Sequence, residues 1–209
     1  MECLNQITLI GAVVSHLEYS HECYGEKFYT AYVKSNRISE ISDTLEVSIP
    51  SHALLAEINE GDTVKIQGRV SSKNAITSGK NKLSVFVFAN EISVVDELTT
   101  HENTVNMEGF ICRPAVLRET PLGREIVDLL LATNSKFRKS SYIPSIAWGR
   151  SAKYIANTCE VGTKLNVQGR LQSREYIKEG IIMTAYELSV AKFEVVVESE
   201  VNVNENQID

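Results

Sequence analysis

The sequence lacks a segment suited to crossing a membrane. A membrane-spanning helix needs about 20 consecutive apolar residues, and no apolar run in the chain approaches that length. The first residues contain neither the basic region nor the apolar region of a secretory signal peptide. These absences predict a cytoplasmic protein with no membrane partner.

Motifs for catalysis and metal binding are absent as well. The chain has no Gly-x-x-x-x-Gly-Lys phosphate loop and no recognisable Ser/His/Asp set. Its four cysteines form no Cys-x-x-Cys pair, and we expect reduced, mostly buried thiols. His16, His21 and Cys23 lie close in sequence but lack a fourth zinc ligand. We therefore predict a protein that is not an enzyme and needs neither metal nor cofactor.

Basic residues are not in excess overall, but they are concentrated in one part of the chain. The formal net charge is −6, which by itself disfavours a nucleic-acid partner. Residues 1–100 carry a net charge of −5, residues 101–195 carry +3, and residues 196–209 carry −4. The second half therefore has the positive charge that a polyanion requires, and the end of the chain is acidic.

One sequence pattern occurs twice. Residues 5–11 (Asn-Gln-Ile-Thr-Leu-Ile-Gly) are echoed by residues 103–109 (Asn-Thr-Val-Asn-Met-Glu-Gly) at an offset of 98. Residues 61–70 match residues 162–171 at an offset of 101, and residues 91–94 match residues 187–190 at an offset of 96. The offset changes only between matched blocks, as insertions and deletions in loops would cause.

Each copy predicts the same series of elements. The spacing of apolar residues indicates three strands joined by polar loops, a short amphipathic helix and a final hairpin. In the first copy the strands are residues 7–14, 28–35 and 45–49, the helix is residues 51–59, and the hairpin turns near residues 78–82. In the second copy the strands are residues 105–111, 126–133 and 142–148, the helix is residues 151–159, and the hairpin turns at residues 178–180.

Five strands with a helix between the third and fourth, in about 95 residues, are typical of the oligonucleotide- and oligosaccharide-binding (OB) barrel. Gly68 and Gly169 fall inside strands, where a small barrel bends sharply. The sequence predicts an all-β protein with short helices, built as two tandem five-stranded OB-fold barrels. The predicted limits are residues 1–96 for the first barrel, 97–102 for a linker, 103–195 for the second barrel and 196–209 for an acidic, disordered tail.

The second copy carries a dense set of short motifs. They are Asn103-x-Val105-x-Met107-x-Gly109, Leu131-Ala132-Thr133-Asn134, Tyr142-Ile143-Pro144, Ala147-Trp148-Gly149-Arg150 and Gly169-Arg170-Leu171-Gln172-x-Arg174-x-Tyr176. As a set, they make residues 103–193 resemble the barrel of bacterial single-stranded DNA-binding proteins, the SSB family. The resemblance implies a nucleoid-associated protein that binds single-stranded DNA during replication, recombination or repair.

In that family, bases stack on aromatic side chains at recurring places, and the resemblance implies four here: Phe137, Tyr142, Trp148 and Tyr176. Tyr142 and Trp148 share strand parity, so we expect both on one face. Stacking tolerates any base because every base has a π face. The alternatives are a core position for Trp148, and surface positions without function for Phe137 and Tyr176.

Cations near these rings are predicted to contact phosphates. In residues 164–171, Leu165, Val167 and Leu171 alternate with polar and basic residues, so one face is expected in the core and the other on a basic surface. A charged face can also be merely solvated, so the prediction concerns the set as a whole. The candidates are Lys136, Arg138, Lys139, Arg150, Lys153, Lys164, Arg170 and Arg174.

The first copy keeps cations but has no rings at the matching places. Its third strand contains no aromatic residue, and Ala75 stands opposite Tyr176. Lys65, Arg69 and Lys73 are its weaker candidates for phosphate contact. The aromatic residues of its first loop and second strand, Phe28 among them, are not assigned to a face. This copy is expected either to bind DNA weakly by charge or to act mainly in assembly, with most of the affinity in residues 101–195.

The resemblance also implies an assembly. SSB proteins present four barrels together, so a chain with two barrels is predicted to form a homodimer. The chain ends Asn206-Gln207-Ile208-Asp209, without the terminal aromatic residue of the family's tail, so recruitment of replication proteins by that route is not expected. The alternative function is an OB-fold adaptor, primosome-like or phage-encoded, that acts mainly through protein contacts.

Overall fold

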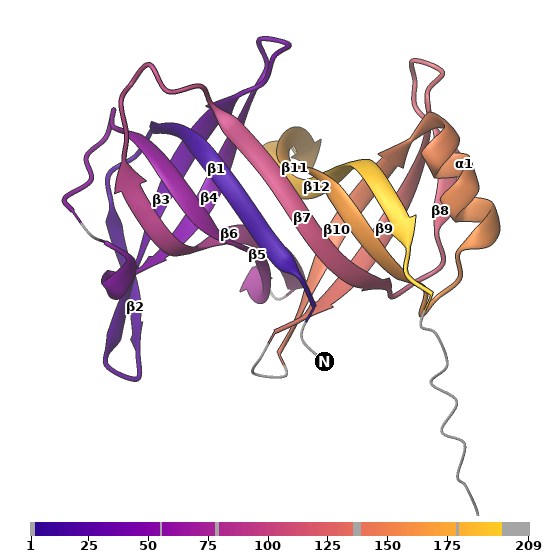
Figure 1. Cartoon of the computed structure of the whole chain (residues 1–209), viewed down its shortest axis with the longest axis horizontal. Helices are drawn as coiled ribbons and strands as arrows, with labels where there is room; N and C mark the ends of the chain where they lie inside the picture. The colour runs from indigo at the N-terminus through magenta and orange to yellow at the C-terminus, as the bar shows by residue number, and fades with distance from the viewer. Residues whose placement is uncertain (1–2, 55, 78–79, 136–138, 179, 198–209) are drawn as a thin grey trace, which may run out of the picture.

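In the described part of the chain, twelve strands join edge to edge and curl into two barrels (Figure 1). The structure, a computed structural model, describes residues 3–54, 56–77, 80–135, 139–178 and 180–197. Among these residues, no helix is long and apolar enough to cross a membrane. The tandem OB-fold prediction is confirmed, whereas the domain limits proposed from the sequence stay a prediction.

The first barrel closes on itself. Its strands are β1 (Asn5–Val13), β2 (Glu18–Cys23), β3 (Glu26–Asn36), β4 (Ser42–Pro50), β5 (Thr63–Thr77) and β6 (Lys80–Val94). They follow the order β2-β3-β4-β6-β5-β1, and a second pairing of β1 with β3 closes the ring. Among the described strands of this barrel, β2 alone stands outside the ring, and it pairs with β3.

The second barrel repeats this topology. Its strands are β7 (Glu102–Ile111), β8 (Val116–Glu119), β9 (Glu125–Asn134), β10 (Ser140–Trp148), β11 (Lys164–Lys178) and β12 (Ile181–Val195), with helix α1 (Gly149–Thr158) between β10 and β11. The order is β7-β11-β12-β10-β9-β8, closed by a pairing of β7 with β9. Helix α1 buries Ala152 and Ile155 against the barrel.

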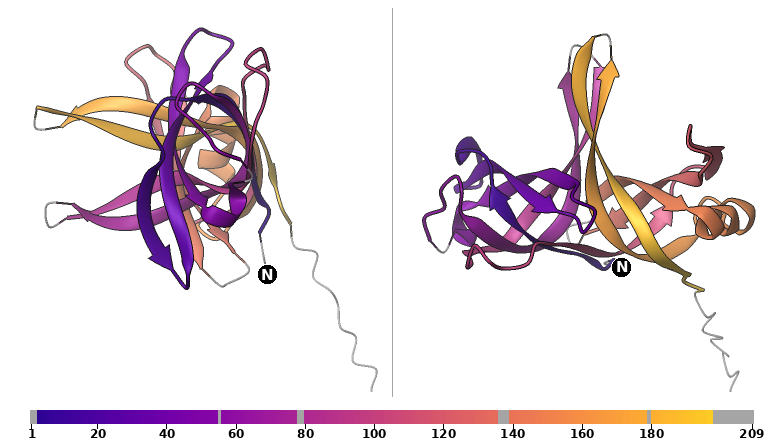
Figure 2. Two further views of the ribbon diagram at one scale, coloured as in Figure 1. Left: turned by 90° about the vertical axis from the view of Figure 1, so that its left-hand side faces the viewer. Right: turned by 90° about the horizontal axis from the view of Figure 1, so that it is seen from above.

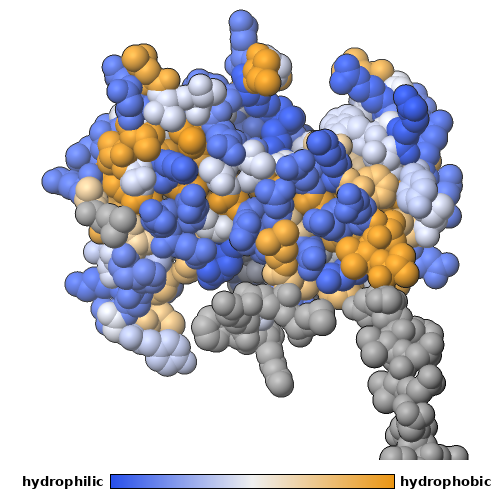
Figure 3. Space-filling view, in the orientation of Figure 1, coloured by the Kyte–Doolittle hydropathy of each residue, from blue (hydrophilic) through white to orange (hydrophobic). Residues whose placement is uncertain are grey.

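The two barrels are joined through their first strands. β1 and β7 pair antiparallel from Asn5↔Met107 to Ile10↔Glu102, so the strands run side by side between the barrels in Figure 1. The inward residues of both barrels, such as Leu9, Val33, Met107 and Ile143, are almost fully buried. On the face drawn in Figure 3, hydrophobic residues form separate patches between hydrophilic ones, as expected when most apolar side chains lie inside the barrels.

Each barrel extends a long hairpin toward the other. The β5–β6 and β11–β12 hairpins project from the same side of the molecule (Figure 2). The Ser72 hydroxyl accepts a hydrogen bond from the backbone N–H of Tyr142 at 2.8 Å, and Ser173 accepts one from the N–H of Thr44 at 3.1 Å. These contacts occupy matching places in the repeat, so the hairpins connect the barrels in an approximately two-fold arrangement.

In each barrel, one asparagine side chain bonds to the strand where it continues into the long hairpin. Asn5 donates a hydrogen bond to the Val70 carbonyl at 2.8 Å and accepts one from the Val70 N–H at 3.0 Å. Asn103 forms the same pair of bonds with Leu171, at 2.7 and 3.1 Å. Each side-chain amide thus takes the place of a neighbouring strand and satisfies both the backbone N–H and the backbone C=O of Val70 or Leu171.

The prediction of a helix at residues 51–59 is wrong. Among the described residues of this segment, Ser51–Ala53 form a single 3-10 turn, and Leu54 is already extended. Leu54 instead bridges to Ile92 on β6, so the backbone bonds with the sheet. Such a short segment gains little from helix formation alone.

Two strands occur where the sequence predicted polar loops. All residues of β2 and β8 are exposed. Because neither face of these strands is buried, they lack the apolar alternation by which strands are detected. Of the four cysteines, only Cys3 and Cys159 are buried, so the expectation of mostly buried thiols holds for half of them.

At Gly169, the backbones of β11 and β12 approach so closely that a larger residue should destabilise the fold. The ladder between β11 and β12 shifts register there, and a Cβ atom would lie 2.1 Å from the Ser189 carbonyl oxygen. We expect Gly169→Ala to lower the free energy of unfolding by about 1–3 kcal/mol, measured by urea titration. Gln168→Ala, at the exposed neighbouring position, is the control and should change it by about 0.5 kcal/mol or less. Equal stability of the two variants would contradict the close approach.

Candidate functional site

Two of the predicted rings lie on the outer face of β10. Tyr142 is 42% exposed and Trp148 is 38% exposed, whereas Ile143 and Ala147 are buried on the opposite face. The indole N–H of Trp148 donates a hydrogen bond to the Ser189 hydroxyl at 3.3 Å. Trp148 is therefore a surface residue held in place by β12, and the alternative of a core position does not apply.

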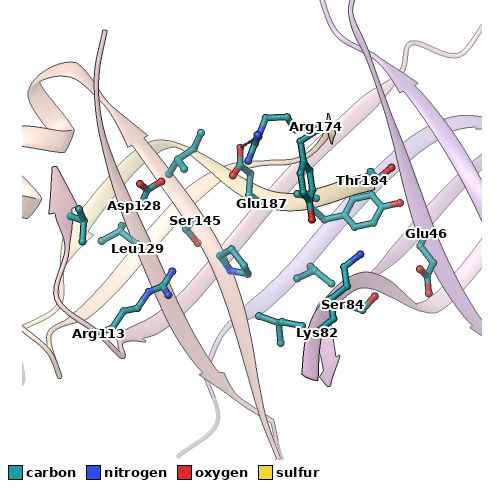
Figure 4. A pocket seen from close by; sticks show the side chains of 18 of the residues that line it. Glu46, Lys82, Ser84, Arg113, Asp128, Leu129, Ser145, Arg174, Thr184 and Glu187 are labelled. Atoms are coloured by element: carbon teal, nitrogen blue, oxygen red, sulfur yellow. Dashed lines mark ion pairs between the residues drawn. The ribbon is translucent and has the colours of Figure 1, made fainter. Parts of the chain in front are cut away.

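The third ring, Tyr176, lies on the β11–β12 hairpin. The Arg174 guanidinium is 5.8 Å from the centre of its ring, and Arg174 Nε lies 3.8 Å from a carboxylate oxygen of Glu187. Tyr176 and Arg174 line a pocket between the second barrel and strands β3, β4 and β6 of the first. Figure 4 shows this pocket, with Arg174 labelled. The first barrel therefore contributes to the surface around Tyr176.

This pocket contains charges of both signs. Arg113 reaches it from the second barrel and Lys82 from β6 (Figure 4). Neither cation was predicted from the sequence, because Arg113 lies in a loop and Lys82 in the expected hairpin turn. Carboxylates line the pocket as well, namely Glu46, Asp128 and Glu187. Asp128 is paired with Arg118, so part of the negative charge is balanced within the barrel.

The other predicted phosphate contacts differ in how available they are. Lys139 and Arg150 are exposed. Lys153 pairs with Glu125 at 2.9 Å, and Lys164 pairs with Glu108 at 3.0 Å with only 12% of its side chain exposed. A phosphate would have to compete with these two carboxylates. Lys136, Phe137 and Arg138 lie outside the described residues.

A buried ion pair lies where the β11–β12 hairpin meets the first barrel. Asp43, 1% exposed, accepts hydrogen bonds from Arg37 at 2.5 and 2.8 Å and from the N–H of Ser173 at 2.9 Å. The bond to Asp43 raises the pKa of Arg37. Arg170 is nearby, and burial lowers its pKa, with a further contribution from the charge of Arg37. Asp43 therefore joins the first barrel to the β11–β12 hairpin, and its charge partly offsets the lowering of the Arg170 pKa.

The first barrel has aromatic residues that the sequence did not assign. Phe86 and Phe88 alternate with buried Val85, Val87 and Ala89, so they lie on the outer face of β6. Phe28 lies on the same face of β3 as Thr30, which is the outer face because Ala31, on the opposite face, is buried. The predicted cations Arg69 and Lys73 lie against these rings, whereas Lys65 is half-buried on β5. The alternation of Phe86 and Phe88 with valines was the signal that would have revealed this surface.

Within the described residues, no cluster of three or more histidine, cysteine or acidic side chains has the arrangement of a metal site. The surfaces described above offer rings, cations and hydroxyl groups, and the pocket near Tyr176 adds carboxylates.

Residues 102–196 match the model of the single-strand binding protein family. The second barrel belongs to that family. Its sequence relatives include a single-stranded DNA-binding protein of Streptococcus mutans and single-stranded DNA-binding protein A of Bacillus subtilis, each 34% identical over 80 residues. These matches cover 35% of this chain and 49% and 46% of the two relatives, so the match spans about half the length of the relatives.

A solved structure matches both barrels together. The wild-type single-stranded DNA binding protein from Thermus aquaticus superposes with a TM-score of 0.78 and 20% sequence identity, covering 95% of this chain and 96% of the other. At this identity the likeness concerns the fold, and it agrees with the tandem OB-fold arrangement.

Tyr186, on β12 where the hairpin meets the first barrel, generates a prediction on pH. Burial, with smaller contributions from Tyr32 and Glu46, raises its pKa from 10.0 to about 12. The folded state thus favours the neutral phenol. Its contribution to the free energy of unfolding is fully present below pH 10 and is lost as pH rises toward 12.

Tyr186→Phe should remove this dependence. We expect the difference in free energy of unfolding between wild type and Tyr186→Phe to change by about 1–2 kcal/mol between pH 9 and about 11.5, to the disadvantage of wild type, since the side chain is partly exposed. Urea titrations at both pH values measure it. A difference that stays constant with pH would contradict the assigned environment of Tyr186.

Proposed function

We propose that the chain binds single-stranded DNA without strong sequence preference, by base stacking and phosphate contacts, in replication, recombination or repair. The observation that carries the proposal is the exposed position of Trp148 and Tyr142 on the outer face of β10. Large aromatic side chains on a strand are usually buried. Rings presented on the surface of an OB barrel are the stacking platform that unpaired bases use.

The surroundings of these rings support the same proposal. Tyr176 and Arg174 extend the platform along the hairpin, and Arg113 and Lys82 bring further positive charge to the adjoining pocket. Lys139, Arg150 and, outside the described residues, Lys136 and Arg138 add cations along the chain. The relatives of the second barrel carry names that describe the same activity.

The rest of the predicted function follows from this proposal. Binding of this kind requires no catalytic group and no cofactor. We place the site of action in the cytoplasm, at the nucleoid, and keep residues 1–96 and 103–195 as the two barrel domains with the acidic tail from residue 196.

Titration of fluorescent oligo-dT tests the proposal directly. Affinity should fall as salt rises, because phosphate contacts release counterions. Trp148→Ala and Tyr176→Ala should each weaken binding about 5- to 100-fold, since stacking contributes about 1–3 kcal/mol per base.

The control is Tyr24→Ala, which removes a fully exposed ring at the turn between β2 and β3. It should bind like wild type. Circular dichroism should confirm that all variants are folded. Absence of oligo-dT binding by wild type at low salt would refute the proposal and favour an adaptor that binds proteins. Unchanged binding by Trp148→Ala and Tyr176→Ala would refute the site.

We further propose that two chains associate so that four OB-folds act together. The expected mass in solution is twice the 23.3 kDa of the chain. Sedimentation equilibrium across a range of concentrations measures it. A monomer at all concentrations would contradict the dimer without affecting the proposed binding surface.

A further inference from the structure

The outer face of the first barrel gathers rings that its core does not use. Phe86 and Phe88 on β6 and Phe28 on β3 are all half-buried. The Phe28 and Phe88 ring centres are 6.3 Å apart, and the His21 ring stacks on Phe28 at 4.7 Å with an interplanar angle of 5°. Three strands thus place four rings on one connected surface.

Cations lie directly against these rings. The Arg69 guanidinium carbon is 3.7 Å from the centre of the Phe88 ring, and Lys73 Nζ is 5.1 Å from that of Phe86. Arg69 also donates a hydrogen bond to the Asn90 side chain at 3.0 Å, which fixes the guanidinium plane over the ring. Flat rings and guanidinium planes are the surfaces on which unpaired bases stack.

These side chains line a groove of about 900 Å³ between the two barrels. The second barrel also contributes to the lining of this groove, with Asn134, Lys139 and Ser141 among others. Among the described residues that line the groove, none is aspartate or glutamate, whereas Arg69, Lys73 and Lys139 are cationic. The groove therefore has the charge complementary to a polyanion, without the carboxylates that line the pocket near Tyr176.

Comparing the first copy with the second, position by position, does not find these rings, because the two barrels place them on different strands. Pro50 of β4 occupies the place of Trp148 in β10, and Phe88 of β6 occupies the place of Ser189 in β12. The two strands are neighbours in each barrel. At this level of the outer face, the second barrel therefore has Trp148 on β10, whereas the first barrel has Phe88 on β6 and, opposite Pro50, Phe28 on β3.

We propose that the first barrel binds an unpaired nucleic-acid strand in this groove, with bases on Phe88, Phe28 and Phe86 and phosphates at Arg69, Lys73 and Lys139. The ion pair of Lys73 with Glu46, 3.6 Å long with 56% of the lysine side chain exposed, is weak enough to exchange for a phosphate. Because Lys139 and Ser141 belong to the second barrel, a strand in the groove passes from one barrel to the other. This proposal rests on the proposed function and adds a second contact surface to it.

The experiment uses two readouts on the full chain. Trp148 is the single tryptophan, so its fluorescence reports binding at the second barrel. Anisotropy of labelled oligo-dT reports total affinity and, at saturation, the number of nucleotides bound per chain. The variant Phe88→Leu with Arg69→Gln removes the ring and the cation while keeping apolar volume.

For this double variant we expect at least about fivefold weaker binding of long oligo-dT and fewer nucleotides bound per chain. Quenching of Trp148 by a short oligo-dT should stay as in wild type. The matched control, Tyr19→Leu, removes an exposed ring that packs on Tyr29 outside the groove, and it should leave both readouts unchanged. Wild-type affinity and site size in the double variant would overturn the proposal while leaving the proposed function intact.

Ultraviolet crosslinking of oligo-dT to the wild-type chain provides a test that does not depend on a folded variant. Crosslinks to the peptide that contains Phe86 and Phe88 support the groove as a nucleic-acid site. Crosslinks confined to the second barrel overturn it, and point to a peptide or to no ligand in the groove. If the wild-type chain shows neither Trp148 quenching nor crosslinks, the proposed function fails together with this inference.

Discussion

The antiparallel pairing of β1 with β7 is the constraint on which the rest of the structure depends. It joins two closed barrels through a continuous ladder from Asn5↔Met107 to Ile10↔Glu102, and so fixes their relative orientation. With the barrels held in this way, each long hairpin meets the body of the other barrel, where Ser72 and Ser173 accept matching hydrogen bonds. Both the groove and the pocket with Tyr176 lie between parts of different barrels, so neither surface would exist without this pairing.

Within this nearly symmetric frame, the two barrels differ in the chemistry of their surfaces. The second barrel presents Trp148 and Tyr142 on β10 beside a pocket that contains carboxylates. The first barrel presents Phe88 on the neighbouring strand, under the Arg69 guanidinium, beside a groove without described carboxylates. Since a change on the outer face of a strand leaves the core intact, the sites can diverge while the barrels keep the same fold.

The fold could be predicted from the sequence because its main signals repeat. The alternation of core residues such as Leu165 and Val167, and the glycines at 68 and 169, indicated strands and bends that the structure has. The strands β2 and β8 could not be predicted, because both of their faces are exposed. The helix at 51–59 was wrong because Leu54 bonds with β6, a contact distant in sequence. Parity predicted that Tyr142 and Trp148 share one face. The alternation of Phe86 and Phe88 with valines indicated an outer face in the same way and was overlooked, whereas the contact of these rings with Arg69 and Lys73 depends on the register of β5 against β6, which the pattern does not give.

The short connection between the barrels has a consequence for how the pairing responds to concentration. Only the segment between Val94 and Glu102 separates β6 from β7, and Asn36 and Ser35 of β3 hold its end by hydrogen bonds to His101 and Glu102. Two barrels on separate chains would separate on dilution, because their association is bimolecular. Linked barrels meet at an effective concentration in the millimolar range set by the connection. The two barrels should therefore stay paired at protein concentrations low enough for separate single-barrel chains to dissociate.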